Sequence, residues 1–109
     1  MEELDGDRPA EALINTSTDP SGVPVVTVSG DLDLSNAGTL EATVASVAAE
    51  GPDELIFDLS GLRFMDSAGI AVLLLAVAQV DTVRLRAPSA AVRRVVELTG
   101  LTDVLPIES

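Results

Sequence analysis

Residues 55–75 read L-I-F-D-L-S-G-L-R-F-M-D-S-A-G-I-A-V-L-L-L, a stretch in which the hydrophobic pattern changes. Leu55 to Leu59 is an apolar run of strand length, followed by the turn dipeptide Ser60-Gly61. After Asp66 the apolar residues form a longer run, which is typical of a buried helix. The stretch therefore predicts a central strand, a loop, and a buried helix that ends near Gln79 or Val80.

Asp66 is well placed to cap this helix, because an aspartate side chain accepts backbone N–H groups two or three residues further on. Ser67 and Ala68 are then the first helical residues. A hydroxyl at this position lies at the positive end of the helix dipole, where added negative charge is tolerated. Taken alone, a serine here has the simpler interpretation of a capping residue.

The residues before this stretch predict a hairpin and a helix. Ala12 to Thr18 and Val23 to Ser29 have strand character, and Asp19-Pro20-Ser21-Gly22 between them is a turn signal. Residues 30–36 predict a loop in which Ser35 or Asn36 caps the next helix. Apolar residues at helical spacing, closed by Gly51-Pro52, predict that this helix ends near Ala49.

The residues after it predict a further strand and helix. Thr82 to Ala87 alternates apolar and polar residues, which predicts a strand with its arginines on the wetter face. Ser89 is a candidate cap for a short helix over Ala90 to Leu98. Residues 101–107 predict a short closing segment, with an edge strand as one alternative.

Strands that alternate with helices favour an α/β sandwich. We expect a mixed sheet of four to five strands, with an antiparallel N-terminal hairpin, later strands parallel, and about three helices. The chain of 109 residues fits one domain, with 1–11 as a disordered acidic leader and 12–109 as the folded part.

Composition excludes several classes of function. The net charge of −12 opposes nucleic-acid binding, and the nearest approach to a basic patch is Arg84, Arg86, Arg93 and Arg94. The chain has no cysteine, histidine or lysine, so we expect no metal site, no cofactor and no enzyme built on the usual bases. Without a signal peptide or a bilayer-length apolar run, we expect a cytoplasmic protein that does not insert into membranes.

The segment D-L-S-G-L-R-F-M-D-S-A-G-I, residues 58–70, resembles the signature of the STAS family, whose best-known members are bacterial anti-sigma factor antagonists. Every position fits the family pattern except Ala68, where a second hydroxyl residue is usual. The segment G-D-L-D-L at 30–34 and the closing segment at 95–107 are also similar to family segments. The resemblance implies the STAS fold.

The resemblance also implies a function. In similar antagonists, the serine after the aspartate, here Ser67, is phosphorylated by an anti-sigma factor with serine-kinase activity and an ATPase fold. Acids at the positions of Asp31 and Asp33 contact basic residues of that kinase. The implied binding surface is completed by Asp66, Ser67, Ala68 and Gly69, and phosphorylation acts indirectly on a sigma factor.

Two alternatives remain beside this interpretation. An enzyme with Ser67 as nucleophile is disfavoured, because M-D-S-A-G is not the G-x-S-x-G motif and no usual base is present. A non-switching STAS adaptor, or a scaffold subunit of a signalling or transporter complex, stays open. Three departures from the family pattern leave it open: Ala68, a connection before Thr82 about one turn shorter than usual, and the end of the chain at Ser109.

Overall fold

The computed structural model describes residues 11–108, which form one five-stranded sheet and three helices. The elements in chain order are β1 (Ala12–Thr18), β2 (Pro24–Leu32), α1 (Ala37–Ala48), β3 (Glu54–Met65), α2 (Ser67–Gln79), β4 (Thr82–Arg86), α3 (Ala90–Leu98) and β5 (Ile107–Glu108). The strands lie in the sheet in this same order. β1 and β2 are antiparallel and all later pairs are parallel, which confirms the predicted mixed sheet.

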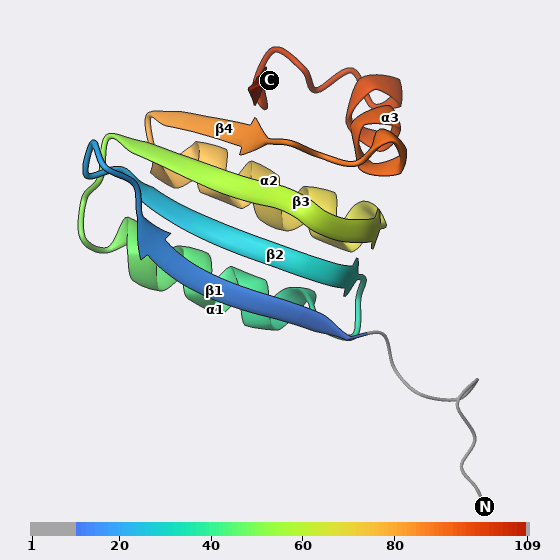
Figure 1. Cartoon of the computed structure of the whole chain (residues 1–109), viewed down its shortest axis with the longest axis horizontal. Helices are drawn as coiled ribbons and strands as arrows, with labels where there is room; N and C mark the ends of the chain where they lie inside the picture. Colours follow the sequence, from blue (N-terminus) through green and yellow to red (C-terminus); the bar gives the residue numbers. More distant parts are fainter. Residues whose placement is uncertain (1–10, 109) are drawn as a thin grey trace, which may run out of the picture.

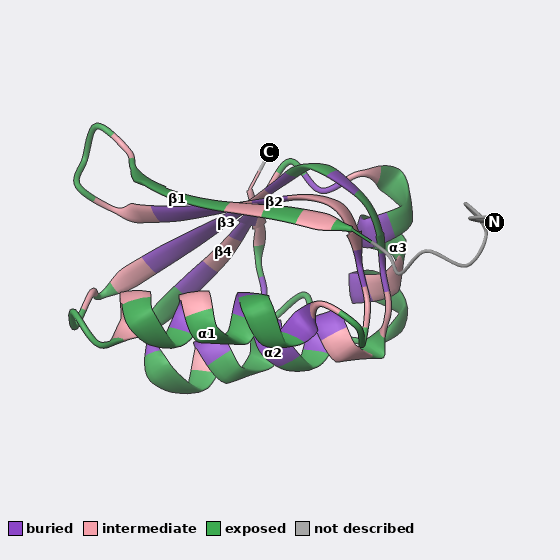
Figure 2. Ribbon diagram, turned by 90° about the horizontal axis from the view of Figure 1, so that it is seen from below, coloured by how far each residue is buried: buried purple, intermediate pink, exposed green. Residues whose placement is uncertain are grey.

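Helices cover one face of the sheet. Figure 2 shows α1 and α2 side by side beneath it, while α3 stands at one end of the molecule, where it contacts β3. Figure 1 shows the same arrangement at right angles to that view, with α1 and α2 behind the strands. No helix of the described residues lies over the opposite face, so α2 has one side against the sheet and one side toward solvent.

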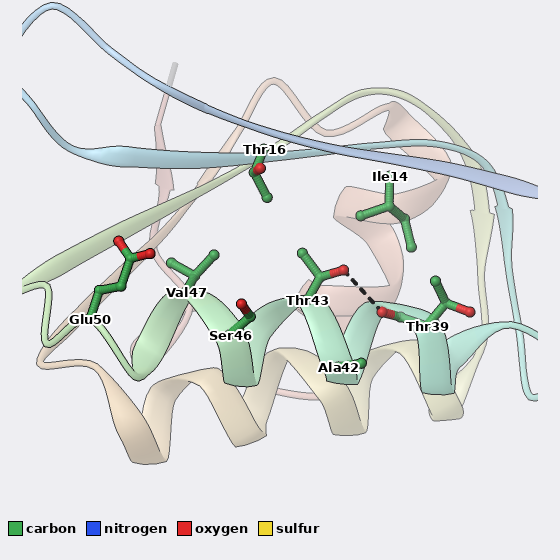
Figure 3. Close-up of a pocket in the computed structure, with 8 residues that line it drawn as sticks. All are labelled: Ile14, Thr16, Thr39, Ala42, Thr43, Ser46, Val47 and Glu50. Atoms are coloured by element: carbon green, nitrogen blue, oxygen red, sulfur yellow. Dashed lines mark hydrogen bonds between the residues drawn. The ribbon is translucent and has the colours of Figure 1, made fainter.

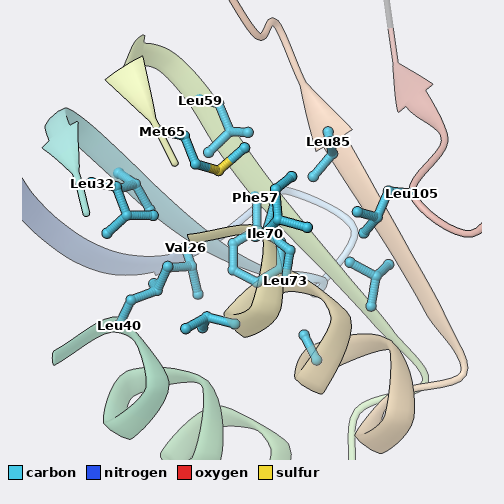
Figure 4. Packing of buried hydrophobic residues seen from close by; sticks show 14 of the residues in the cluster. Val26, Leu32, Leu40, Phe57, Leu59, Met65, Ile70, Leu73, Leu85 and Leu105 are labelled. Carbon is cyan, nitrogen blue, oxygen red and sulfur yellow. The ribbon is translucent and has the colours of Figure 1, made fainter. Parts of the chain in front are cut away.

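The core lies between the sheet and this helix layer. Val26, Phe57, Leu73 and Leu85 are completely buried there (Figure 4). In β3 the consecutive residues Leu55, Ile56 and Phe57 are all buried, although α1 and α2 lie over one face of the sheet only. Large side chains on β3 therefore fix the position of both α2 and the neighbouring strands.

The expected strand over 55–59 is too short. β3 continues through Ser60-Gly61 to Met65, because these residues pair with β2 and not with each other in a turn. The pairing Ser29–Gly61 is close: a Cβ on Gly61 would lie 2.8 Å from the Cβ of Ser29. The pairing of β2 with β3 contains two register shifts, which accommodate the extra residues of β3. The turn signal in the sequence therefore marks β-bulges within a strand and not a turn.

The expected loop over 30–36 is also partly strand. β2 extends to Leu32, whose side chain is buried. Gly30 permits this with a φ of 90° and a close approach to the backbone of Glu11. Tertiary pairing with β3 again overrides a local turn signal.

Other boundaries follow the sequence closely. β1 and α3 have the predicted limits, and α2 ends at Gln79. Gly51, after α1, has a φ of 73°, as expected for a glycine that ends a helix. The closing strand differs: β5 has two residues, and the segment before it forms a turn that buries Leu105.

The predicted leader over residues 1–11 lies outside the described residues, except for Glu11. The Glu11 carbonyl accepts the N–H of Asp31 at 2.9 Å. Between residues 11 and 108, no helix has both the length and the hydropathy needed to cross a bilayer.

Candidate functional site

The structure brings the predicted site residues to one edge of the sheet. β2 and β3 are parallel and end side by side, with Leu32 beside Met65 in the register. The N–H of Asp66 donates to the carbonyl of Leu32 at 3.2 Å, which fixes the two strand ends together. Asp31 and Asp33 therefore lie beside the start of α2. We call the residues at this edge, Asp31, Asp33, Asp66 and Ser67, the carboxyl-edge site.

Asp66 caps α2, as predicted. Its φ of −102° and ψ of −168° are extended, and its Oδ1 accepts the N–H groups of Ala68 at 2.8 Å and Gly69 at 3.4 Å. The carbonyl of Asp66 also accepts the N–H of Ile70 at 3.2 Å. The backbone donors of residues 68–70 in the first turn of the helix are therefore already engaged.

Ser67 is the first residue of α2 and is exposed. Its position beside the cap, at the end of two parallel strands, makes the hydroxyl accessible to another protein. Ala68 is half-buried and packs against the core. Ala68, the residue that departs from the family pattern, is therefore less exposed than Ser67.

Gly69 is buried beneath the site. A Cβ at this position would lie 2.5 Å from Cγ of Met65 and 2.8 Å from Cδ2 of Leu32. The absence of a side chain lets α2 approach the ends of β2 and β3. Gly69 would therefore affect a contact with a partner through the packing of α2, and not through a side chain of its own.

Asp31 is paired inside the chain. Nε of Arg63 lies 3.3 Å from Oδ1 of Asp31, and Nη2 of Arg63 donates to Oδ2 at 3.3 Å. The Arg63 side chain is 76% exposed, so the pair contributes at most about 1 kcal/mol to stability. A basic partner can therefore replace Arg63 beside Asp31 at little cost.

Asp33 organises the loop that leads into α1. Its Oδ1 accepts the N–H of Ser35 at 2.9 Å and the hydroxyl of Ser35 at 2.6 Å. Asn36 occupies the N-cap position of α1, but its side chain makes no cap hydrogen bond. It accepts the N–H of Asp33 at 3.0 Å and donates to the carbonyl of Asp31 at 2.9 Å. Asn36 thus holds the predicted N-cap position, but the prediction that its side chain caps the helix is wrong. Its amide joins the loop backbone to β2 by hydrogen bonds instead.

Two exposed apolar residues at this edge were not among the predicted site residues. Leu34 is 82% exposed in the loop after β2, and Phe64 is 52% exposed beside Asp31 in the register. The sequence signal for both was present. Each is a large apolar residue next to a predicted acidic contact.

The arginines of β4 do not form a free basic patch. Arg84 pairs with Glu54 and Glu108, and Nε of Arg86 donates to Oε1 of Glu108 at 2.8 Å. This hydrogen bond raises the pKa of the Arg86 guanidinium above its ordinary value. Both arginines are thus neutralised by acids of the same chain.

A groove of about 500 Å³ lies elsewhere, between β1 and α1. Ile14 and Thr16 line one side, and Thr39, Thr43 and Val47 are among the residues on the other (Figure 3). The Thr43 hydroxyl donates to the carbonyl of Thr39 at 3.1 Å. The groove includes none of the carboxyl-edge residues. Within the part of the chain that the structure describes, no group of three or more acidic, histidine or cysteine residues could hold a metal ion.

Comparison with known proteins shows which family the chain matches. The STAS domain model matches residues 16–109. The anti-sigma-F factor antagonist RsfB of Mycobacterium tuberculosis is 35% identical over 63 residues, which cover 58% of this chain and 52% of RsfB. The chain thus spans about half the length of RsfB. The anti-sigma-F factor antagonist RsfA of the same organism is 31% identical over 105 residues, which cover 90% of this chain and 81% of RsfA.

A solved structure agrees with these matches. The crystal structure of an anti-sigma factor antagonist from Mycobacterium paratuberculosis superposes with a TM-score of 0.82 at 32% identity. The superposition covers 89% of this chain and 85% of that one. Sequence and fold therefore point to the same group of proteins.

Proposed function

Because the chain belongs to the STAS domain family, we propose that it is an anti-sigma factor antagonist. The antagonists of this family are binding proteins and not enzymes. In this proposal the chain binds an anti-sigma factor that has serine-kinase activity, and so frees the sigma factor that the kinase would otherwise hold. Phosphorylation of Ser67 ends the binding.

The observation that carries the proposal is the exposed Ser67 hydroxyl at the first residue of α2. It lies at the strand ends that also carry Asp31, Asp33 and Asp66. The acids suit a partner with basic residues. A kinase bound over this edge would have the hydroxyl within its reach.

The chemical step is phosphoryl transfer from ATP. Ser67 Oγ attacks the γ-phosphorus of ATP, the new O–P bond forms, and the bond to the β-phosphate oxygen breaks to release ADP. The hydroxyl proton passes to a base of the kinase. The product carries about −1.5 to −2 charges on Ser67.

Phosphorylation would weaken the complex for two reasons. The N–H groups of Ala68 and Gly69 already donate to Asp66, so they are not free to neutralise the phosphate. The first-turn N–H groups of a helix can hold a phosphate, but here the cap takes two of them. The phosphate would also face the ADP from which it came, and these like charges repel.

The functional consequence is a switch. Unmodified protein occupies the kinase, and the sigma factor is free to direct transcription. Once Ser67 is phosphorylated, the released kinase captures its sigma factor and transcription is switched off.

Intact-mass measurement after incubation with the cognate kinase and ATP tests the proposal. We expect a mass increase of one phosphate for the wild-type chain and none for Ser67→Ala. Ser46→Ala is the matched control, because Ser46 is an exposed serine of α1 outside the carboxyl-edge site and its variant should still gain one phosphate. A wild-type chain that binds the kinase but gains no phosphate would favour the adaptor function.

A further inference from the structure

α2 has no polar residue between Ala68 and Ala78. A helix that is apolar on every side is normally enclosed on every side. Here, however, one side of α2 faces solvent, and Leu74 and Leu75 are 36% and 40% exposed. Ala71 and Ala78 are exposed beside them. We call Ala71, Leu74, Leu75 and Ala78 the α2 stripe.

The α2 stripe begins about one helical turn after Ser67. Its residues follow Ser67 by four, seven, eight and eleven positions, which places all of them on the same face of the helix. With a rise of 1.5 Å per residue, Leu74 and Leu75 lie about 11–12 Å from Ser67 along the axis. The apolar surface is therefore a continuation of the carboxyl-edge site.

From this continuity we infer that the α2 stripe is a second part of the docking surface for the anti-sigma factor partner, an inference that rests on the proposed function. A typical interface buries about 800 Å² on each partner, equivalent to a flat disc with a radius of about 16 Å. A disc centred on Ser67 reaches both leucines. The partner surface that covers the stripe is apolar and uncharged, and basic residues flank it where it meets Asp66 and Asp31.

A second copy of this chain fits the stripe less well. The stripe is one helix wide, about 10 Å, and about 11 Å long, which is far below the area that a stable dimer needs. Two copies would also bring together chains of net charge −12. A basic partner meets attraction at the Ser67 end instead, and the stripe adds apolar contact to it.

The test is the affinity of the double variant Leu74→Gln, Leu75→Gln for the cognate kinase, measured by titration calorimetry. Glutamine is a good helix former and both positions are partly exposed, so the variant should fold. We expect an affinity at least about tenfold lower than that of the wild-type chain. Leu98→Gln is the control, since Leu98 is 75% exposed at the end of α3 and its variant should bind like the wild type.

The outcomes separate this inference from the proposed function. Wild-type affinity in the double variant would overturn the docking role of the stripe and leave the Ser67 switch intact. A wild-type chain with no affinity for the kinase would overturn both. Equal losses in the double variant and Leu98→Gln would overturn the inference, as would a wild-type dimer in sedimentation that the double variant abolishes.

Discussion

The only two phenylalanines of the chain, Phe57 and Phe64, stand seven positions apart in β3. Phe57 is fully buried, whereas Phe64 is 52% exposed. The two residues also lie in halves of the strand that are paired differently. Residues 54–58 pair with β4, and residues 56–58 also pair with β2 on the other side. The later residues of the strand pair with β2 alone, across two register shifts.

One strand thus performs two tasks. Its first half is held on both edges and fixes the position of α2 and the sheet. Its second half has one free edge and carries Asp66 and Ser67 to the end of the sheet. The comparison shows how a site can be exposed and still be precisely placed, because the enclosed half of the same strand anchors it.

Phe57→Ala should have the largest effect on stability. Removing a fully buried ring leaves a cavity, so we expect a loss of about 3–5 kcal/mol in the free energy of unfolding. Phe64→Ala, in the same strand, should cost about 1 kcal/mol or less, since the ring is half exposed. Urea unfolding of both variants measures the difference, and similar losses would contradict the division of β3.

Gly69→Ala tests whether Met65, the last residue of β3, is tightly packed although the second half of the strand has one unpaired edge. The new methyl group would collide with Met65 and Leu32, so we expect a loss of about 1–3 kcal/mol. Gly38→Ala is the matched control. A Cβ there meets no atom within 4 Å, and the change should stabilise α1 by about 0.5–1 kcal/mol. A Gly69→Ala variant as stable as the wild type would show that this contact is loose.

Hydrogen exchange should separate the two halves of β3 directly. We expect residues 55–59 to exchange mainly through global unfolding, and residues 60–65 to exchange at least about tenfold faster. The whole of 55–75 should still be the most protected region of the chain. Equal protection along β3 would mean that the free edge does not loosen the second half.

Asp66→Ala should have a smaller effect on stability. Loss of an N-cap costs about 1 kcal/mol, and Ser89→Ala, which removes the cap of α3, should cost a similar amount. Asp66→Asn keeps a capping oxygen and should be nearly neutral. Thermal unfolding of the three variants measures this, and a fully stable Asp66→Ala would show that the cap is dispensable.

Much of the fold could be predicted from hydrophobic pattern and capping residues. The limits of β1 and α3, the cap at Asp66 and the parallel arrangement of the later strands follow from local sequence and topology rules. The STAS fold and family were recognised from residues 58–70, and the comparisons confirm both. The family resemblance implied one binding surface for Asp31, Asp33, Asp66 and Ser67, and the pairing of β2 with β3 brings these residues to one edge of the sheet.

The rest could not be predicted because it depends on contacts between distant segments. Ser60-Gly61 and Gly30 carry strong turn signals, yet pairing of β2 with β3 holds both in strands. Asn36 was a natural cap by sequence, but the nearby backbone of Asp31 and Asp33 offers its amide better partners. The exposure of Leu34, Phe64 and the α2 stripe depends on which faces the helices leave open.

The central claim is that a phosphate on Ser67 ends a protein–protein contact. Titration calorimetry of the cognate kinase with four proteins tests it: wild type, Ser67→Ala, Ser67→Asp and the enzymatically phosphorylated chain. We predict that Ser67→Ala binds like the wild type and that Ser67→Asp binds more weakly. Because a carboxylate carries less charge than a phosphate, the phosphorylated chain should bind most weakly. Equal affinities for the phosphorylated and unmodified proteins would contradict the switch.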